Sequence, residues 1–348
     1  MRKNLLFLLV LWPAVSFAQF RINGKIIDSA TKAPVAGASV FLGNASAGAS
    51  TNNDGLFSIT GVRGGQYTLI VSVVGYAPYM QNVLVNNDMA LSTISIGKKN
   101  TMLKEVRIGP PRNWEKDYQR FKNGFISFSD NAQECTILNP HVLSFDSDEG
   151  VFTAKNDGLL VIENKALGYR IKYLLYSYRD DKKNGILLYY GTAFFENMQG
   201  SAHRIKKWRQ KRLDTYLGSN MHFLRAVITG RVKEEGFTVE RLIRKPNPNY
   251  KGGLDNKYIA TLVTKPLEAN EYAHLTDVPG EYAIKFEDCL YVVYKGAQAA
   301  GSTVTINAPY LYFDNNGIII NLQDILMEGP WGESRIPEML PVDYEPGK

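Results

Sequence analysis

Residues 53–74 read NDGLFSITGVRGGQYTLIVSVV, and they predict two β-strands separated by a tight turn. Asn53-Asp54-Gly55 is a turn signal, because glycine tolerates positive φ and Asx side chains bond the nearby backbone. The apolar runs that follow, 56–59 and 67–74, are rich in the β-branched and aromatic residues that favour sheets. The chain therefore begins as β structure.

Strands of similar length flank this pair on both sides. We expect them over 20–28, 38–42, 81–85 and 91–96, with the small, polar residues 43–49 forming a loop. Short strands with turn signals at this spacing predict a seven-stranded β-sandwich over residues 19–97. Turn geometry explains Gly55, Gly65 and Gly75, and corner packing explains Tyr76.

The order of motifs in this domain resembles the carboxypeptidase regulatory-like domain. The residues that carry the resemblance are 24–28, 34–40, 51–57, 65–69 and 74–76. The family is a transthyretin-like β-sandwich. In the Bacteroidetes it often precedes TonB-dependent receptors, or it occurs in periplasmic proteins of unassigned role. The resemblance therefore implies an accessory, non-catalytic domain in an envelope protein.

The resemblance does not extend to the zinc enzyme for which that domain is named. Zinc carboxypeptidases place two metal ligands in a His-x-x-Glu pair. None of the four histidines has glutamate three residues later; they are His141, His203, His222 and His274. A three-ligand zinc site is therefore not expected, and we predict no metal and no cofactor.

The first 18 residues have the layout of a secretory signal peptide. Arg2 and Lys3 precede an apolar run over 5–12, and residues 16–18 supply a small-x-small cleavage pattern. A membrane anchor is the alternative, but a span needs roughly 20 apolar residues, and Pro13 interrupts this run. We expect an exported protein, periplasmic or associated with the outer membrane. Export removes nucleic acid as a target despite the net charge of +6.

The second domain is predicted to begin after a stiff boundary. Residues 98–112 are read as a linker, in which Gly109-Pro110-Pro111 restrains the backbone and 102–108 could add one strand. Residues 113–348 predict a β-rich α+β domain that starts with a helix over 114–122. Strands are expected over 151–154, 159–163, 169–178, 186–195, 257–263, 282–286, 289–294, 302–306, 310–313 and 317–322, and the end of the chain is expected to pack on the sheet.

A short helical insert of two segments interrupts these strands, over 204–216 and 219–228. The first segment is strongly basic, and its candidate partner contacts are Lys206, Lys207, Trp208, Arg209, Lys211 and Arg212. These cations could contact anionic lipid headgroups, bind an acidic partner, or form a solvated helix face. Trp208 could be a core or interface anchor or a sugar platform. The chain as a whole resembles Bacteroidetes secreted proteins known only by their regulatory-like domain, on motifs that recur together at 176–178, 189–195, 208–212, 216–219, 222–225, 235–237, 335–341 and 343–346.

Cys135 and Cys289 leave two readings open. An oxidising compartment would allow one disulfide, which in the entropy model would stabilise the chain by about 4–5 kcal/mol. Two buried free thiols are the alternative.

No catalytic constellation emerges from the sequence. The densest polar cluster joins Tyr216, Ser219, His222 and Arg225, and we read it as structural, because spacing alone places no base beside a nucleophile. The acidic residues 146–149 are read as a solvated loop. We therefore predict a non-enzymatic envelope protein whose sandwich is a docking or spacing module. Its second domain would bind a protein, peptide or glycan, with an outer-membrane receptor as one candidate; a polymer hydrolase is the alternative.

Overall fold

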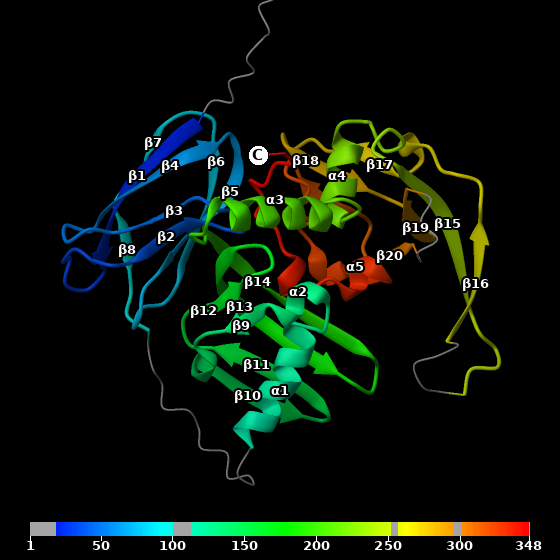
Figure 1. The fold of residues 1–348 in the computed structure, drawn as a ribbon, viewed down its shortest axis with the longest axis horizontal. Coiled ribbons are helices and arrows are strands. Elements are labelled where there is room, and N and C mark those ends of the chain that lie inside the picture. Colours follow the sequence, from blue (N-terminus) through cyan, green and yellow to red (C-terminus); the bar gives the residue numbers. More distant parts are fainter. Residues whose placement is uncertain (1–18, 100–112, 252–256, 296–300, 348) are drawn as a thin grey trace, which may run out of the picture.

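The computed structural model describes residues 19–99, 113–251, 257–295 and 301–347, and it shows a mainly β protein (Figure 1). Residues 1–18, with the predicted signal peptide, and most of the predicted linker lie outside the described residues. So does the strand predicted over 102–108. None of the helices in the described stretches is long and apolar enough to cross a membrane.

The N-terminal domain consists of two facing four-stranded sheets. One contains β1 (Gln19–Asp28), β4 (Leu56–Arg63), β7 (Met89–Ala90) and β8 (Ile94–Ile96). The other has the order β3-β2-β5-β6, with β2 (Ser39–Leu42), β3 (Gly48–Ser50), β5 (Gly65–Ser72) and β6 (Tyr79–Val85). The described strands number eight, and seven were predicted. The loop expected over 43–49 was partly wrong, because its last residues pair with β2.

Alternating apolar side chains build the core of the sandwich. Phe57, Ile59 and Val62 point inward from β4 and meet Leu69 and Val71 of β5. The corner at Tyr76 is closed by its hydroxyl, which donates to Asp28 Oδ2 at 2.8 Å. The Thr31 N–H and this hydroxyl together lower the pKa of Asp28 to about 2. Tyr76 thus has the corner role predicted for it.

A six-stranded sheet forms the first half of the C-terminal domain. It contains β9 (Cys135–Ile137), β10 (Leu143–Asp148), β11 (Val151–Asn156), β12 (Leu160–Asn164), β13 (Tyr169–Asp181) and β14 (Ile186–Asn197). Helices α1 (Trp114–Phe125) and α2 (Asp130–Gln133) accompany it, with Phe121 and Phe125 of α1 in its core. The loop predicted at 146–149 was wrong up to Asp148, because these residues pair along β11.

Two further sheets form the second half. The five-stranded sheet has the order β16-β15-β19-β20-β22, with β15 (Phe237–Pro246), β16 (Tyr258–Val263), β19 (Cys289–Tyr294), β20 (Ser302–Ile306) and β22 (Ile325–Glu328). The three-stranded sheet has β17 (Ala273–Leu275), β18 (Glu281–Ile284) and β21 (Leu311–Asp314). The strand predicted over 317–322 is instead turn and loop with one isolated bridge, Phe313↔Ile319. Helices α3 (Ala202–Tyr216) and α4 (Asn220–Ile228) form the predicted insert between the halves.

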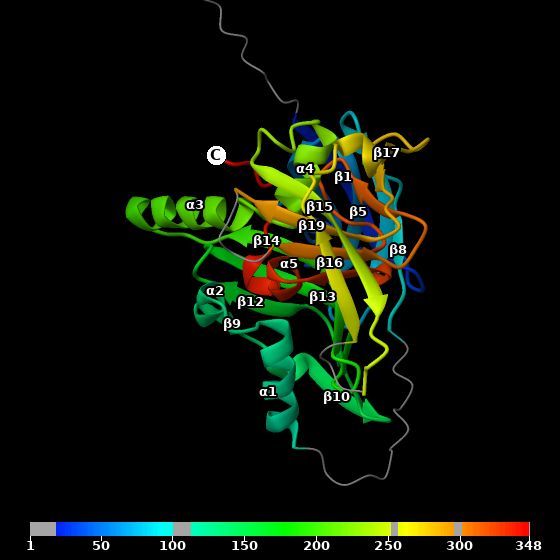
Figure 2. The same ribbon diagram turned by 90° about the vertical axis from the view of Figure 1, so that its right-hand side faces the viewer.

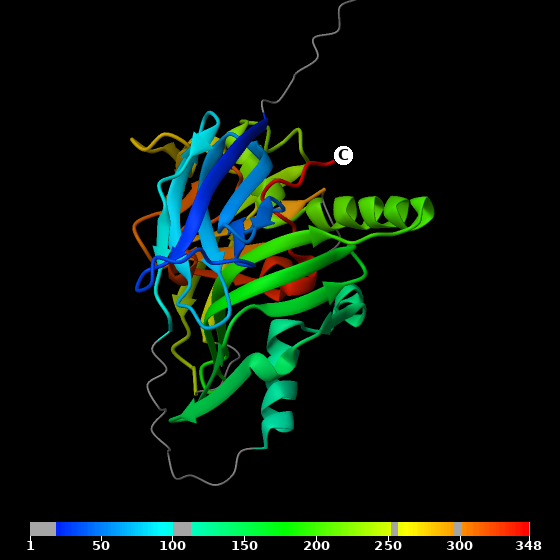
Figure 3. The same ribbon diagram turned by 90° about the vertical axis from the view of Figure 1, so that its left-hand side faces the viewer.

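The C-terminal tail, residues 335–345, joins the six-stranded sheet to the sandwich. Ile336, Leu340 and Tyr344 lie in the core of the six-stranded sheet, whereas Val342 lies in the core of the sandwich. The Val342 N–H donates to the Asn44 carbonyl at 2.7 Å. Before it, α5 (Pro330–Glu333) follows β22. The tail runs between the two domains in Figures 1 and 3, so the prediction that it packs on the sheet is confirmed.

Candidate partner-binding surface

Helix α3 projects from the body of the molecule (Figures 2 and 3). Ser201 caps its start, since its side-chain oxygen accepts from the Arg204 N–H. The first turn contains no acidic residue. Basic side chains there are opposed by the positive end of the helix dipole, so charge does not favour this helix locally.

Two of the six predicted contact residues hold α3 on the six-stranded sheet. Trp208 is 4% exposed, and its indole N–H donates to the Lys165 carbonyl at 2.8 Å. The ring covers Gly168, which has φ +69° and where a Cβ would collide with the indole. The Arg212 side chain donates to the carbonyls of Leu167 and Gly168 at 2.7 and 3.1 Å. Both side chains are therefore engaged in packing, and Trp208 presents no sugar platform.

The other four predicted residues remain on the surface. Lys206, Lys207 and Arg209 are exposed, Lys211 is half-buried, and none makes an ion pair within the described residues. With exposed Arg204 they form what we term the basic ridge: Arg204, Lys206, Lys207, Arg209 and Lys211. Like charges three or four residues apart on a helix are mutually destabilising. An anionic group docked on the ridge would relieve that repulsion.

The polar cluster around His222 is part of the interior. His222 is 3% exposed; its Nδ1 accepts from the Gly218 N–H at 3.1 Å, and its Nε2 lies 3.1 Å from Glu235 Oε2. Ser219 caps α4 by accepting from the His222 N–H. Desolvation lowers the pKa of His222, although Glu235 opposes the shift. The cluster thus joins α4 to the segment that leads into β15.

Both cysteines are buried free thiols. Cys135 lies in β9 of the six-stranded sheet and Cys289 in β19 of the five-stranded sheet, so the two residues belong to different sheets. Burial raises the pKa of Cys135 to about 12. The disulfide considered from the sequence is therefore not formed in this structure.

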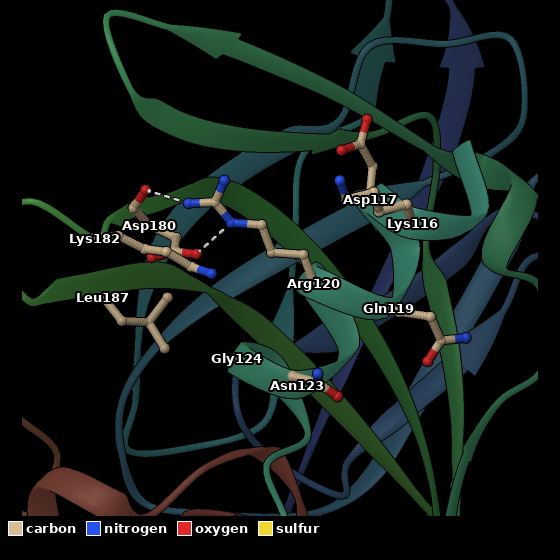
Figure 4. A pocket seen from close by; sticks show the side chains of 9 residues that line it. All are labelled: Lys116, Asp117, Gln119, Arg120, Asn123, Gly124, Asp180, Lys182 and Leu187. Atoms are coloured by element: carbon tan, nitrogen blue, oxygen red, sulfur yellow. Dashed lines mark hydrogen bonds and ion pairs between the residues drawn. The ribbon is translucent and has the colours of Figure 1, made fainter. Parts of the chain in front are cut away.

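A hollow of about 760 Å³ lies between α1 and the β13–β14 hairpin (Figure 4). Arg120 spans it and donates from Nε to Asp180 Oδ2 at 2.7 Å, while its guanidinium covers the Phe152 ring. The lining residues are Lys116, Asp117, Gln119, Arg120, Asn123, Gly124, Asp180, Lys182 and Leu187. This set offers no hydroxyl, thiol or imidazole, so the lining contains no nucleophile–base pair of the serine, cysteine or histidine kind.

The described part of the chain contains no group of three or more His, Cys, Asp or Glu side chains placed to hold a metal ion.

The sequence reading missed one surface, the strand β16. The strand itself was predicted over 257–263, but all six of its side chains are exposed, on both faces of the sheet. A signal was present in the sequence, because Lys257 and Lys265 bracket an uncharged apolar run, as lysines do at strand edges.

Residues 22–108 match the model of the CarboxypepD_reg-like domain, as the sequence motifs predicted. No match was found among curated proteins. Similar solved structures include a type II cohesin–X-dockerin complex from Acetivibrio cellulolyticus, at 29% identity over 23% of this chain and 58% of that chain, with a TM-score of 0.21. The major pilin subunit of Bacillus cereus is 9% identical over 90% of this chain and 95% of that chain, with a TM-score of 0.21. A DUF3823 family protein from Bacteroides uniformis is 10% identical over 89% of this chain and 99% of that chain, with a TM-score of 0.18.

Proposed function

We propose, from the premise that residues 22–108 match the CarboxypepD_reg-like domain, that this chain is an exported, non-enzymatic envelope protein. It binds an acidic protein, peptide or glycan through the basic ridge of α3. The sandwich serves as a docking or spacing module. The observation that carries the proposal is that the exposed cations of α3 have no ion-pair partner among the described residues.

Rigid attachment supports a spacing role for the sandwich. The Ala193 N–H donates to Asn44 Oδ1 at 3.0 Å, and the Asn44 N–H donates to the Ala193 carbonyl at 2.7 Å. Phe41 of the sandwich stacks on Phe194 of β14, with ring centroids 5.3 Å apart. These contacts fix the sandwich against β14, and the chain leads from the end of β14 into α3.

Anchoring by Trp208 supports a docking role for the ridge. The buried indole holds the helix in place while the cations of the ridge, of which only Lys211 is half-buried, stay exposed around it. A rigid array of charges loses less conformational freedom on binding than a flexible tail. Opposite charge on the partner would also accelerate association.

The test measures binding of the purified chain to polyglutamate, to alginate and to phosphatidylglycerol vesicles at low and at physiological salt. Lys206→Glu/Lys207→Glu should weaken binding to an acidic polymer about tenfold, with the effect reduced as salt screens the charges. Lys155→Glu/Lys183→Glu is the matched control, because it makes the same charge change at exposed residues of the six-stranded sheet and its hairpin turn.

Equal losses in the two double variants would show general charge attraction and would overturn the ridge as the site. Binding to the vesicles alone would replace the acidic partner by a membrane surface. Export is tested separately, by N-terminal sequencing of the protein purified from its native envelope. A chain that begins near Gln19 is expected, and an intact Met1 on protein from the cytosol would overturn export.

A further inference from the structure

Strand β16 is an edge strand with an uncovered side. Among the described strands it pairs only with β15, in an antiparallel ladder without a register shift. Tyr258, Ile259, Leu262 and Val263 are each at least 36% exposed. Soluble proteins usually protect such an edge with a charge, a proline or a bulge within the strand. None of these interrupts Tyr258–Val263.

The end of the β15–β16 pair extends beyond the rest of its sheet (Figure 1). β19 pairs with β15 only from Phe237 to Leu242, so the last residues of β15 have β16 as their only strand neighbour among those described. Two-stranded ribbons are marginally stable in water, and a third strand adds both hydrogen bonds and covered apolar surface. This arm is therefore built to accept another strand.

The register shows which backbone groups of β16 face outward. The Asn247 N–H donates to the Lys257 carbonyl, so these two residues form a hydrogen-bonded pair. Antiparallel pairs alternate, so Ile259 and Thr261 also bond β15. The N–H and C=O groups of Tyr258, Ala260 and Leu262 then point to the free edge. Pro246, which lacks an N–H, agrees with this assignment, since it lies opposite Tyr258.

The charges at this edge that have no ion-pair partner among the described residues are all positive. Lys245, Lys251, Lys257 and Lys265 are all exposed around the apolar strand. Lys245 lies opposite Ile259 in the ladder, and Lys257 and Lys265 flank the two ends of β16. A strand with an apolar centre and carboxylates at its ends would match this pattern in both hydrophobicity and charge.

A second copy of the chain matches the edge less well. Two antiparallel copies of β16 can exchange outward-facing bonds with Ala260 opposite Ala260, or with Ala260 opposite Leu262. The first register places Lys257 diagonally across from Lys265 of the second copy, and the second places the two lysines directly opposite. Like charges in cross-strand positions are destabilising. The charge pattern therefore favours a different, acidic polypeptide.

We infer that β16 is a docking edge for an extended segment of a partner polypeptide, with alternating apolar residues between acidic ends, which adds to the five-stranded sheet as a further strand. The surface is separate from the basic ridge, and its occupant is an extended strand, whereas the ridge requires only negative charge. The inference therefore stands whether or not the ridge binds a partner.

The test is a selection of random 12-residue peptides displayed on phage against the immobilised full chain. Enriched peptides should have an apolar centre with Asp or Glu at the ends. Ala260→Pro should weaken them at least tenfold, because it removes an outward-facing N–H and leaves the bonds to β15 in place. Lys257→Glu/Lys265→Glu should do the same without any proline in the strand, and Lys206→Glu/Lys207→Glu should have no effect.

A selection that yields no such family, or peptides that bind Ala260→Pro as well as the wild type, would overturn the inference. Loss in the Lys206→Glu/Lys207→Glu variant alone would assign those peptides to the ridge. Sedimentation equilibrium provides the remaining outcome. A wild-type dimer that Ala260→Pro dissociates would show that a second copy occupies the edge, and would overturn the acidic partner.

Discussion

Arg225 of α4 donates from Nη2 to the carbonyl of Val342 at 2.8 Å, and Val342 places its side chain in the core of the β-sandwich. The same guanidinium donates to the carbonyls of Tyr344 and Asn316, at 2.9 and 2.8 Å. The next tail residue, Asp343, accepts from the N–H and the hydroxyl of Ser46. One arginine in the C-terminal domain thus positions the segment that joins it to the sandwich.

Arg225→Met should destabilise the protein by roughly 2–4 kcal/mol. The change removes three hydrogen bonds from a charged donor and leaves their carbonyl acceptors without that partner. Urea unfolding would give the loss in free energy, and limited proteolysis should cleave the tail sooner than in the wild type. Arg209→Met is the control, because Arg209 is exposed. Equal unfolding midpoints for the two variants would show that the tail is held without Arg225.

Trp208→Ala should cost about 3–5 kcal/mol, as is typical when a large buried ring is removed. Lys207→Ala should change stability by less than about 0.5 kcal/mol, as expected for an exposed residue. Thermal unfolding of both variants shows whether Trp208 anchors the helix, whereas the adjacent Lys207 serves only to contact a partner. A Trp208→Ala protein of wild-type stability that had lost partner binding would place the indole at the interface instead.

The reactivity of the two thiols tests directly whether both cysteines are buried and unpaired. Neither cysteine should react with Ellman's reagent in the native protein, because both are buried, and the raised pKa of Cys135 suppresses its thiolate. Both should react once the chain is unfolded without a reductant. A protein whose unfolded form released no thiol would contain the disulfide that this structure lacks.

Local patterns were sufficient to predict most of the strands, and pairing partners decided the exceptions. The turn at Asn184-Gly185 and the apolar runs beside it predicted the β13–β14 hairpin, because that signal is contained in adjacent residues. β15 was not predicted, since its sequence FTVERLIRKP alternates poorly and ends in proline. β3 was also missed, because its glycine and small residues become a strand only through pairing with β2.

The candidate site was likewise predicted only where the signal lies in adjacent residues. Helical spacing and charge predicted a basic helix, which the structure has. The sequence could not separate Trp208 and Arg212 from their neighbours, because their partners are the carbonyls of Lys165 and Leu167, more than forty residues away. The lysines that flank β16 were a signal of an edge strand, but the extent of its exposure also depends on where β19 stops pairing with β15, which the local sequence does not show.

From the lowered pKa of His222 we predict that the protein loses stability as the pH falls below neutrality. Folding lowers the pKa of His222, chiefly by desolvation, so near its ordinary value of 6.5 the unfolded chain binds the proton more readily. Stability from this group is therefore complete above that value and declines as the pH falls toward the lowered one. Glu235, whose pKa is also lowered on folding, adds its own loss only near and below its ordinary value of 4.5. The interval from pH 7.5 to 5.5 therefore separates the effect of the histidine from that of Glu235.

Urea unfolding across that interval should show a decline in the wild type and a flatter curve in His222→Asn. Asparagine retains an acceptor for the Gly218 N–H but does not titrate. The substitution should therefore lower the free energy of unfolding mainly near pH 7.5, where neutral His222 stabilises the wild type most. His203→Asn, which replaces an exposed imidazole, should keep the wild-type slope. If His222→Asn also kept that slope, the pH dependence would arise elsewhere, and the His222–Glu235 contact would not link folding to protonation.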